Sequence, residues 1–160
     1  LDDVEISEAV TSTLRFLASE LKENIRVEQT LTPGLTVHAN RNKLIHVLTN
    51  LVQNSIDALR RKSFTDGKVA TIRIESRNGE GGVEIRVHDN GTGIAPEHLP
   101  KIFDPFFTTK EVGEGMGLGL SICYRLMTEF GGQIKVDSRP GQHCQFTLVF
   151  PTGKAHLSSS

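Results

Sequence analysis

Apolar residues recur every three to four positions in several stretches of the chain, a spacing that predicts amphipathic helices. In the longest stretch, from about Arg41 to Arg61, the apolar face begins at Leu44 and ends at Leu59. A shorter stretch follows a glycine-rich segment and ends before Gly131-Gly132, a typical helix stop. We expect helices at residues 7–21, 41–61, 96–102 and 117–130.

Other stretches alternate apolar and polar residues, which is the period of a half-buried strand. Two of them, 69–77 and 83–89, are separated by a loop with three glycines and are expected to pair as a hairpin. The remaining strands are expected at residues 25–31, 35–39, 133–138 and 143–150. Hairpins therefore dominate the sheet. The predicted fold is an α/β (α+β) two-layer sandwich, a mixed and mainly antiparallel sheet covered on one face by helices.

The composition narrows the class of protein. A length of 160 residues fits one domain with a core of its own. The net charge of -1 gives no basic surface for a nucleic-acid partner, and no apolar run approaches a membrane span of about 20 residues. Cys123 and Cys144 are far apart in sequence and lie in apolar patterns. We expect them to be buried free thiols rather than a disulfide or a structural zinc site.

The helix predicted at 41–61 carries Asn50 and Asn54 one turn apart on a polar face. Such faces are usually only solvated, but asparagine is a poor helix former, and two in one stripe are unusual. A carboxamide oxygen can ligate Mg²⁺, which prefers oxygen ligands and keeps several waters while it bridges phosphates. Asn54 is therefore a candidate metal ligand. Asn50 is a candidate contact to phosphate or to a metal-bound water.

Asp89 ends a predicted strand and is followed by Gly91 and Gly93. An aspartate in this position is often only a turn residue. The glycines, however, permit a close approach of the backbone to a ligand. A carboxylate held there can accept a hydrogen bond from the 6-amino group of adenine. Guanine has a carbonyl at that position, so ATP is favoured over GTP.

From residue 103 to 116 no hydrophobic period survives, and this segment is expected to be a mobile loop or lid. Lys110, with Thr109 beside it, is either a solvated lysine or a cation that closes on the terminal phosphates. The glycines that follow lead into a helix, whose N-terminus favours anions. The residues proposed to hold phosphates are Lys110, Thr109, Gly115, Gly117, Leu118 and Gly119.

Four motifs in this order resemble the catalytic and ATP-binding domain of sensor histidine kinases, in the superfamily that includes gyrase, heat-shock and mismatch-repair ATPases. Residues 50–58 resemble the N box, 89–93 the first glycine box, 103–110 the F box and 113–120 the second glycine box. The Thr-Thr-Lys of the F box resembles the nitrogen-regulation and dicarboxylate-sensing branch. The resemblance implies a histidine-kinase-type ATPase fold with a glycine-rich ATP lid. It also implies that Asn54 ligates Mg²⁺, that Asp89 reads adenine and that Gly93 packs under the base.

The third glycine segment departs from the family pattern, which often has Gly-Xaa-Gly-Thr. This chain has Gly141-Gln142-His143-Cys144. An adenine contact from the strand that follows is assigned to Thr147, as a weak candidate.

Two functions are compatible with these motifs. A kinase domain would donate the γ-phosphoryl group of ATP to a histidine supplied by another domain, and needs no strong base of its own. A gyrase-type ATPase resembles this domain but uses a glutamate, one turn before the metal-binding asparagine, to activate water. That position holds Asn50, and a carboxamide is a poor general base. A serine-directed kinase and a pseudo-kinase that only binds nucleotide stay open.

The six histidines include none in the setting expected for a phosphoacceptor, an exposed dimerisation helix. We expect residues 1–6 to be a linker from a missing dimerisation and phosphoacceptor domain, 7–151 the ATP-binding domain and 152–160 a flexible tail. The expected partners are that dimerisation domain and, indirectly, a response regulator receiver domain. The fragment is expected to be a monomer and the parent protein a homodimer. The expected location is cytoplasmic, with membrane anchoring of the parent protein left open.

Overall fold

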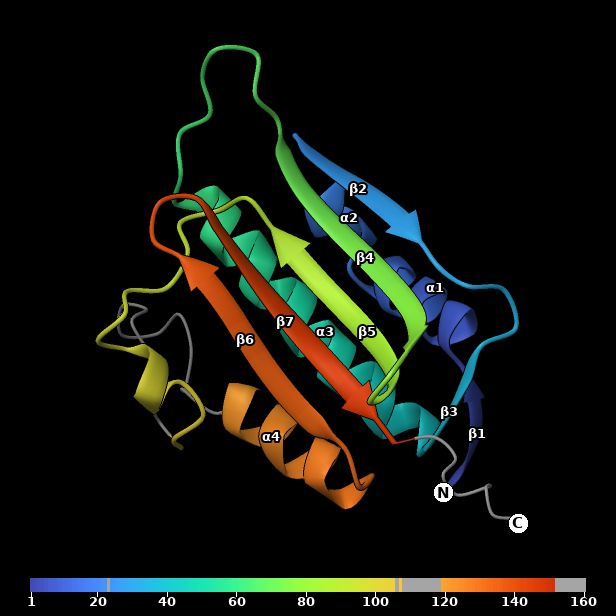
Figure 1. Cartoon of the computed structure of the whole chain (residues 1–160). Coiled ribbons are helices and arrows are strands. Elements are labelled where there is room, and N and C mark those ends of the chain that lie inside the picture. The colour runs from blue at the N-terminus through green and yellow to red at the C-terminus, as the bar shows by residue number, and fades with distance from the viewer. Residues whose placement is uncertain (23, 106, 108–118, 152–160) are drawn as a thin grey trace.

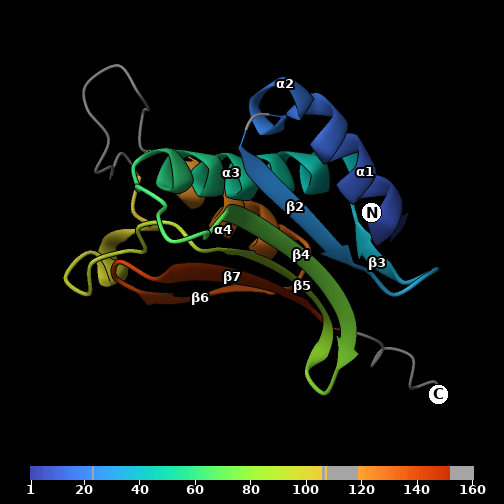
Figure 2. The ribbon, with the colours of Figure 1, turned by 90° about the horizontal axis from the view of Figure 1, so that it is seen from above.

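A computed structural model describes residues 1–22, 24–105, 107 and 119–151 of the chain. Among these residues, five strands form the main sheet in the order β2-β4-β5-β7-β6, and four α-helices accompany it. Helices α1 (Ile6–Phe16), α2 (Ala18–Leu21) and α3 (Arg41–Arg60) lie on one side of this sheet (Figure 2), as the alternation of buried and exposed residues predicts. The predicted two-layer α/β sandwich is confirmed.

The main sheet is mixed but mainly antiparallel. The β4–β5 hairpin pairs with β7, and β7 pairs with β6, all antiparallel (Figure 1). Only the edge strand β2 runs parallel to its neighbour β4 among the described strands. The strands are β2 (Ile25–Thr30), β4 (Ala70–Gly79), β5 (Gly82–Asp89), β6 (Gln133–Arg139) and β7 (His143–Phe150).

The first helical stretch is divided. Residues 7–21 were expected to form one helix, but the structure has α1 (Ile6–Phe16) and α2 (Ala18–Leu21). Leu17 between them leaves helical geometry and buries its side chain. The short helix expected at 96–102 is a single 3₁₀ turn, η1 (Leu99–Lys101).

The segment expected to be only a linker belongs partly to the folded domain. Strand β1 (Asp2–Glu5) pairs with β3 (Thr36–Ala39) in a second, two-stranded sheet. Val4 and Ile6 are buried in the core. The domain boundary predicted at residue 7 is therefore too late. Whether this segment also connects to a further domain stays a prediction.

Helix α3 (Arg41–Arg60) is the centre of the helical layer. The Asn40 side chain caps its N-terminus by accepting a hydrogen bond from the Lys43 amide at 2.9 Å. Its apolar face packs on the sheet and adds about 1.5–3 kcal/mol for each large side chain fully buried. The buried residues of α3 are Leu44, Val47, Leu48, Leu51, Val52, Ser55, Ile56, Ala58 and Leu59.

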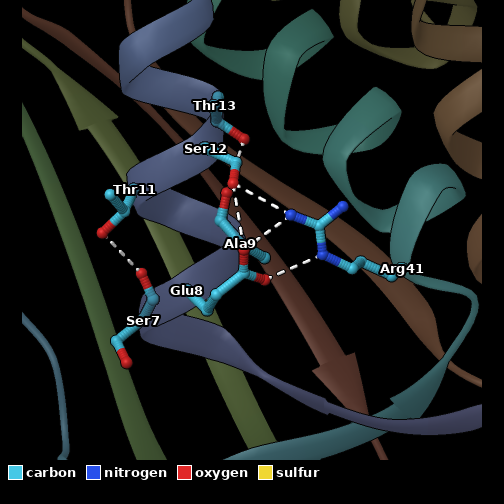
Figure 3. A network of polar contacts seen from close by, with 7 residues as sticks. All are labelled: Ser7, Glu8, Ala9, Thr11, Ser12, Thr13 and Arg41. Carbon is cyan, nitrogen blue, oxygen red and sulfur yellow. Dashed lines mark hydrogen bonds and ion pairs between the residues drawn. The ribbon is translucent and has the colours of Figure 1, made fainter.

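A polar network joins α1 to the start of α3 (Figure 3). The Arg41 guanidinium donates to the Glu8 carboxylate and to the Ser12 hydroxyl. The hydrogen bond from Arg41 lowers the pKa of Glu8. Both partners are about half exposed, so this ion pair adds little to the stability of the domain. None of the helices in the described ranges has the length and apolar character needed to cross a bilayer.

Candidate functional site

Asp89 lies at the last position of β5, on the face of the sheet that meets the helices. Its side chain is 3% exposed, and its Oδ1 accepts a hydrogen bond from the Gly91 amide at 2.8 Å. In the sheet register its partner on β7 is Cys144. The predicted strand-end aspartate is therefore a buried carboxylate held by the glycine loop that follows it.

Burial is the main influence on the charge of Asp89 and raises its pKa above the usual value for an aspartate. The Gly91 amide, Ser55, His143 and Lys62 act against burial and lower the pKa. The Ser55 hydroxyl is close enough for this effect, yet its Oγ is buried without a hydrogen bond of good geometry. The site thus holds a desolvated carboxylate beside a hydroxyl with unused hydrogen-bonding capacity.

Two glycines after Asp89 are required by close packing. A Cβ on Gly91 would lie 2.9 Å from atoms of Ala58 in α3. Gly93 has a φ of +70°, and a Cβ there would lie 2.5 Å from the Arg139 carbonyl oxygen. The glycine loop is therefore pressed between α3 and the β6–β7 turn, which fixes it near Asp89.

Asn50 and Asn54 lie one turn apart on α3, and both side chains are half-buried. Asn50 donates from Nδ2 to the carbonyl oxygen of Gly119, the first residue of α4 (Gly119–Glu129), at 3.3 Å. The Asn54 carboxamide has no hydrogen-bond partner within the described ranges, so no described group competes with a cation for its oxygen. The two asparagines, which the sequence places on one polar face, therefore differ in their contacts in the structure.

These groups are spread along α3. The Asp89 loop meets α3 at Ser55 and Ala58, and α4 meets it at Asn50. Eight residues of helix span about 12 Å along its axis. Asn54 lies between the two ends.

Two phenylalanines in the described part of the F box contact other aromatic rings. The Phe103 ring lies 5.6 Å from the Tyr124 ring on α4, and the Phe107 ring meets His98 edge-on at 5.4 Å. Gly119 lies in ordinary contact with Asn50, with 3.8 Å between the Cβ it lacks and the nearest Asn50 atom. The other predicted phosphate-binding residues fall outside the described residues, namely Thr109, Lys110, Gly115, Gly117 and Leu118.

Thr147 is misplaced for its predicted contact with adenine. It pairs with Arg86 in the register of β5 and β7, on the sheet face opposite the buried face of Asp89. Side chains alternate between faces along a strand, so the residue beside Asp89 is Cys144, three positions earlier. The Thr147 candidate is therefore wrong.

Cys144 and Cys123 are buried free thiols, as expected, and burial raises the pKa of each to about 12.

The sequence interpretation missed that three residues lie near Asp89, namely Cys144, Ser55 and Lys62. Ser55, directly after Asn54, faces Asp89. Lys62, just beyond the end of α3, donates to backbone carbonyls of the glycine loop. The alternation of β7 could have identified Cys144, but no local signal marks Lys62.

The described residues of this site do not suit metal binding by protein ligands alone. No group of three or more His, Cys, Asp or Glu side chains suited to a metal ion occurs among the described residues. The Asn54 carboxamide, which has no partner among the described residues, would suit Mg²⁺ instead, because that ion usually keeps waters and takes further oxygens from substrate phosphates.

Comparison with known proteins shows the family of the chain. Residues 39–154 match the family model described as histidine kinase-, DNA gyrase B-, and HSP90-like ATPase. The match covers more than half of the chain, so the chain belongs to this family.

Within the family, the similar curated proteins are sensor kinases. The chain is 34% identical over 154 residues to sensor histidine kinase ZraS of Salmonella typhimurium, covering 94% of this chain and 31% of the relative. It is 33% identical to the sensory histidine kinase/phosphatase NtrB of Rhizobium leguminosarum bv. phaseoli, covering 94% and 41%. The C4-dicarboxylate transport sensor protein DctB of Rhizobium meliloti is 36% identical, covering 85% and 21%. The chain thus spans less than half the length of these relatives.

The solved structures that superpose on this chain include histidine kinases. The catalytic domain of histidine kinase ThkA, in a nucleotide-free form, superposes with a TM-score of 0.78 at 32% identity, covering 93% of this chain and 95% of that one. Full-length ShkA in complex with AMPPNP superposes with a TM-score of 0.79 at 26% identity, covering 94% and 31%. The domain is therefore of the histidine-kinase catalytic type, and the relatives agree with the branch inferred from the F box.

Proposed function

We propose that this domain binds Mg-ATP and donates the γ-phosphoryl group to a histidine on a separate dimerisation domain, in two-component signal transduction. The observation that carries the proposal is the placement of Asp89. A buried carboxylate, fixed by the Gly91 amide, lies beside Ser55 of α3, the residue directly after Asn54, whose carboxamide has no hydrogen-bond partner in the described part of the chain. The proposed metal ligand therefore lies on the helix against which the proposed base reader packs.

In this proposal Asp89 accepts the adenine 6-amino hydrogen, and the glycine loop allows the base to approach the backbone. Asn54 holds Mg²⁺, which supplies charge neutralisation on the phosphates. Lys110 and the second glycine box hold the terminal phosphates, as predicted from the sequence. The attacking imidazole comes from the dimerisation domain, so the chain needs to position ATP rather than to supply a base.

The competing function is ATP hydrolysis of the gyrase type. Asn50 occupies the position at which that mechanism places a glutamate. Its carboxamide cannot take a proton from water, and its amide nitrogen is already bonded to Gly119. Both points favour the kinase over the ATPase.

The partners follow from the proposed reaction. The dimerisation and phosphotransfer domain belongs to the same parent protein, and a response regulator receiver domain accepts the phosphoryl group in a later step. The isolated domain is proposed to be a monomer, the parent a homodimer and its location cytoplasmic.

Transfer in trans tests the proposal. The chain is incubated with ATP labelled on the γ-phosphate, Mg²⁺ and a separately produced histidine phosphotransfer domain of a sensor kinase. Label that is stable to alkali and lost in acid should appear on that domain, and Asp89→Asn should prevent it. Release of inorganic phosphate by the wild type without any transfer would support the ATPase instead.

A further inference from the structure

Lys62 makes three contacts with backbone carbonyl oxygens. Its Nζ donates to Asn90 at 2.8 Å, to Gly141 at 3.0 Å and to Gly91 at 3.3 Å. An ammonium group has three hydrogens and no acceptor, so all its donors are used. The side chain is half-buried, and its Nζ also lies 5.3 Å from the centre of the Phe64 ring. This lysine is held in one place rather than solvated.

The three carbonyls belong to two loops that are far apart in sequence. Asn90 and Gly91 directly follow Asp89, and Gly141 lies in the β6–β7 turn, about fifty residues later. The same loops are joined by a hydrogen bond from the Gly141 amide to the Thr92 carbonyl oxygen at 2.6 Å. Lys62 therefore closes the glycine loop against the β6–β7 turn. The Gly91 amide inside this loop is the group that fixes the Asp89 carboxylate.

Charge adds to this geometry. The Lys62 ammonium lies near enough to Asp89 to lower the pKa that burial raises. The other ionisable groups facing this carboxyl are the His143 imidazole, which also lowers its pKa, and the neutral thiol of Cys144. An ionised Asp89 is the form that accepts a hydrogen bond from an exocyclic amine.

We propose that Lys62 is a positioning residue for base recognition, which holds the glycine loop and keeps Asp89 ready to accept the adenine 6-amino hydrogen. The inference rests on the proposed binding of ATP. It assigns part of the selectivity for the base to a side chain outside the four motifs.

The test measures selectivity for the 6-amino group. Dissociation constants are measured for Mg-ATP and for the Mg complex of purine riboside triphosphate, which carries hydrogen in place of that amine. The variants are Lys62→Met, Lys62→Gln, which keeps donors without charge, and Lys62→Arg, which keeps both. The matched control is Lys68→Met, because Lys68 is exposed and lies in the same connection between α3 and β4.

The wild type and Lys68→Met should prefer ATP by about tenfold or more, the value of a hydrogen bond to a charged group. In Lys62→Met the preference should fall to about twofold or less, with ATP affinity lost far more than affinity for the analogue. Lys62→Arg should recover most of the preference, and Lys62→Gln only part of it. Should Lys62→Met fail to fold, the comparison of Lys62→Gln with Lys62→Arg carries the test.

A pH series adds a second readout. ATP affinity is measured against pH, and its loss on the acid side should occur at higher pH in Lys62→Gln than in the wild type. The same series is measured with His143→Gln added to both proteins, which removes the neighbouring imidazole. A purely structural lysine would weaken both nucleotides equally and leave the pH of this loss unchanged, which would overturn the proposal. If the wild type bound neither nucleotide, the proposed function itself would fail.

Discussion

Asn50 donates a hydrogen bond to the carbonyl oxygen of Gly119 across 69 residues of sequence, at 3.3 Å. The bond joins the middle of α3 to the first residue of α4. It holds the start of α4, directly after the segment predicted to be the ATP lid. The residue predicted to contact phosphate therefore also has a structural partner.

Replacing Asn50 with alanine should lower the free energy of unfolding by about 0.5–1.5 kcal/mol, the net value of a hydrogen bond in a partly buried place. Urea denaturation measures it. Asn42→Ala is the matched control, because Asn42 is exposed on the same helix and alanine there should raise stability slightly. Equal effects of the two substitutions would show that the bond to Gly119 adds nothing.

Asn54→Ala should leave the free energy of unfolding within about 0.5 kcal/mol of the wild type, because the side chain is only half-buried and has no partner in the described part of the chain. Its effect should appear in nucleotide binding. The gain in ATP affinity from Mg²⁺, measured against EDTA, should be lost in the variant. A variant that keeps this gain would remove Asn54 from the metal site.

Asp89→Asn should separate stability from function. Burial raises the pKa of Asp89 in the folded state, so the folded protein binds the proton more tightly than the unfolded chain does. Wild-type stability should therefore fall, relative to the variant, as pH rises from the unfolded pKa through the folded one. The Asn side chain keeps an oxygen for the Gly91 amide. Unfolding by urea at several pH values measures the difference, and a wild type that gains on the variant with rising pH would contradict the account.

Gly93→Ala should destabilise the domain by about 1–3 kcal/mol from the strained φ alone, and further through the contact with the Arg139 carbonyl oxygen. Gly34→Ala is the control, because Gly34 has a φ of +74° with no atom within 4 Å of the added Cβ. The difference between the two midpoints in urea isolates the close contact. ATP affinity should fall only for Gly93→Ala, and equal midpoints would argue against a pressed loop.

Periodicity predicted the fold because the buried faces are long. Nine residues of α3 and every second residue of β7 are buried. An error of a few residues at the end of such an element does not change whether a helix or a strand is predicted. Strand β1 was missed because only Val4 of its four residues is buried. The break at Leu17 has no proline or glycine to announce it, and the parallel pairing of β2 with β4 depends on contacts distant in sequence.

The residues of the site also divide into those that the sequence could predict and those that it could not. Asp89, Gly91 and Gly93 could be predicted because short motifs carry their backbone requirements. Lys62 could not, because after Arg60 and Arg61 it resembles an ordinary basic residue at a helix C-terminus. Its partners are carbonyl groups, which any residue provides, so only the folded chain shows that it joins two loops. Thr147 was misplaced because the motif was read without the alternation of its strand.

The central claim is that this domain selects ATP through Asp89. Calorimetric titration of Mg-ATP and Mg-GTP into the wild type and into Asp89→Asn tests it most directly, with phosphate release followed in parallel. The account predicts that the wild type binds ATP and not GTP, that the substitution abolishes this binding while the variant stays folded, and that turnover is negligible. Equal binding of both nucleotides, or ATP binding that survives in a folded Asp89→Asn, would contradict it.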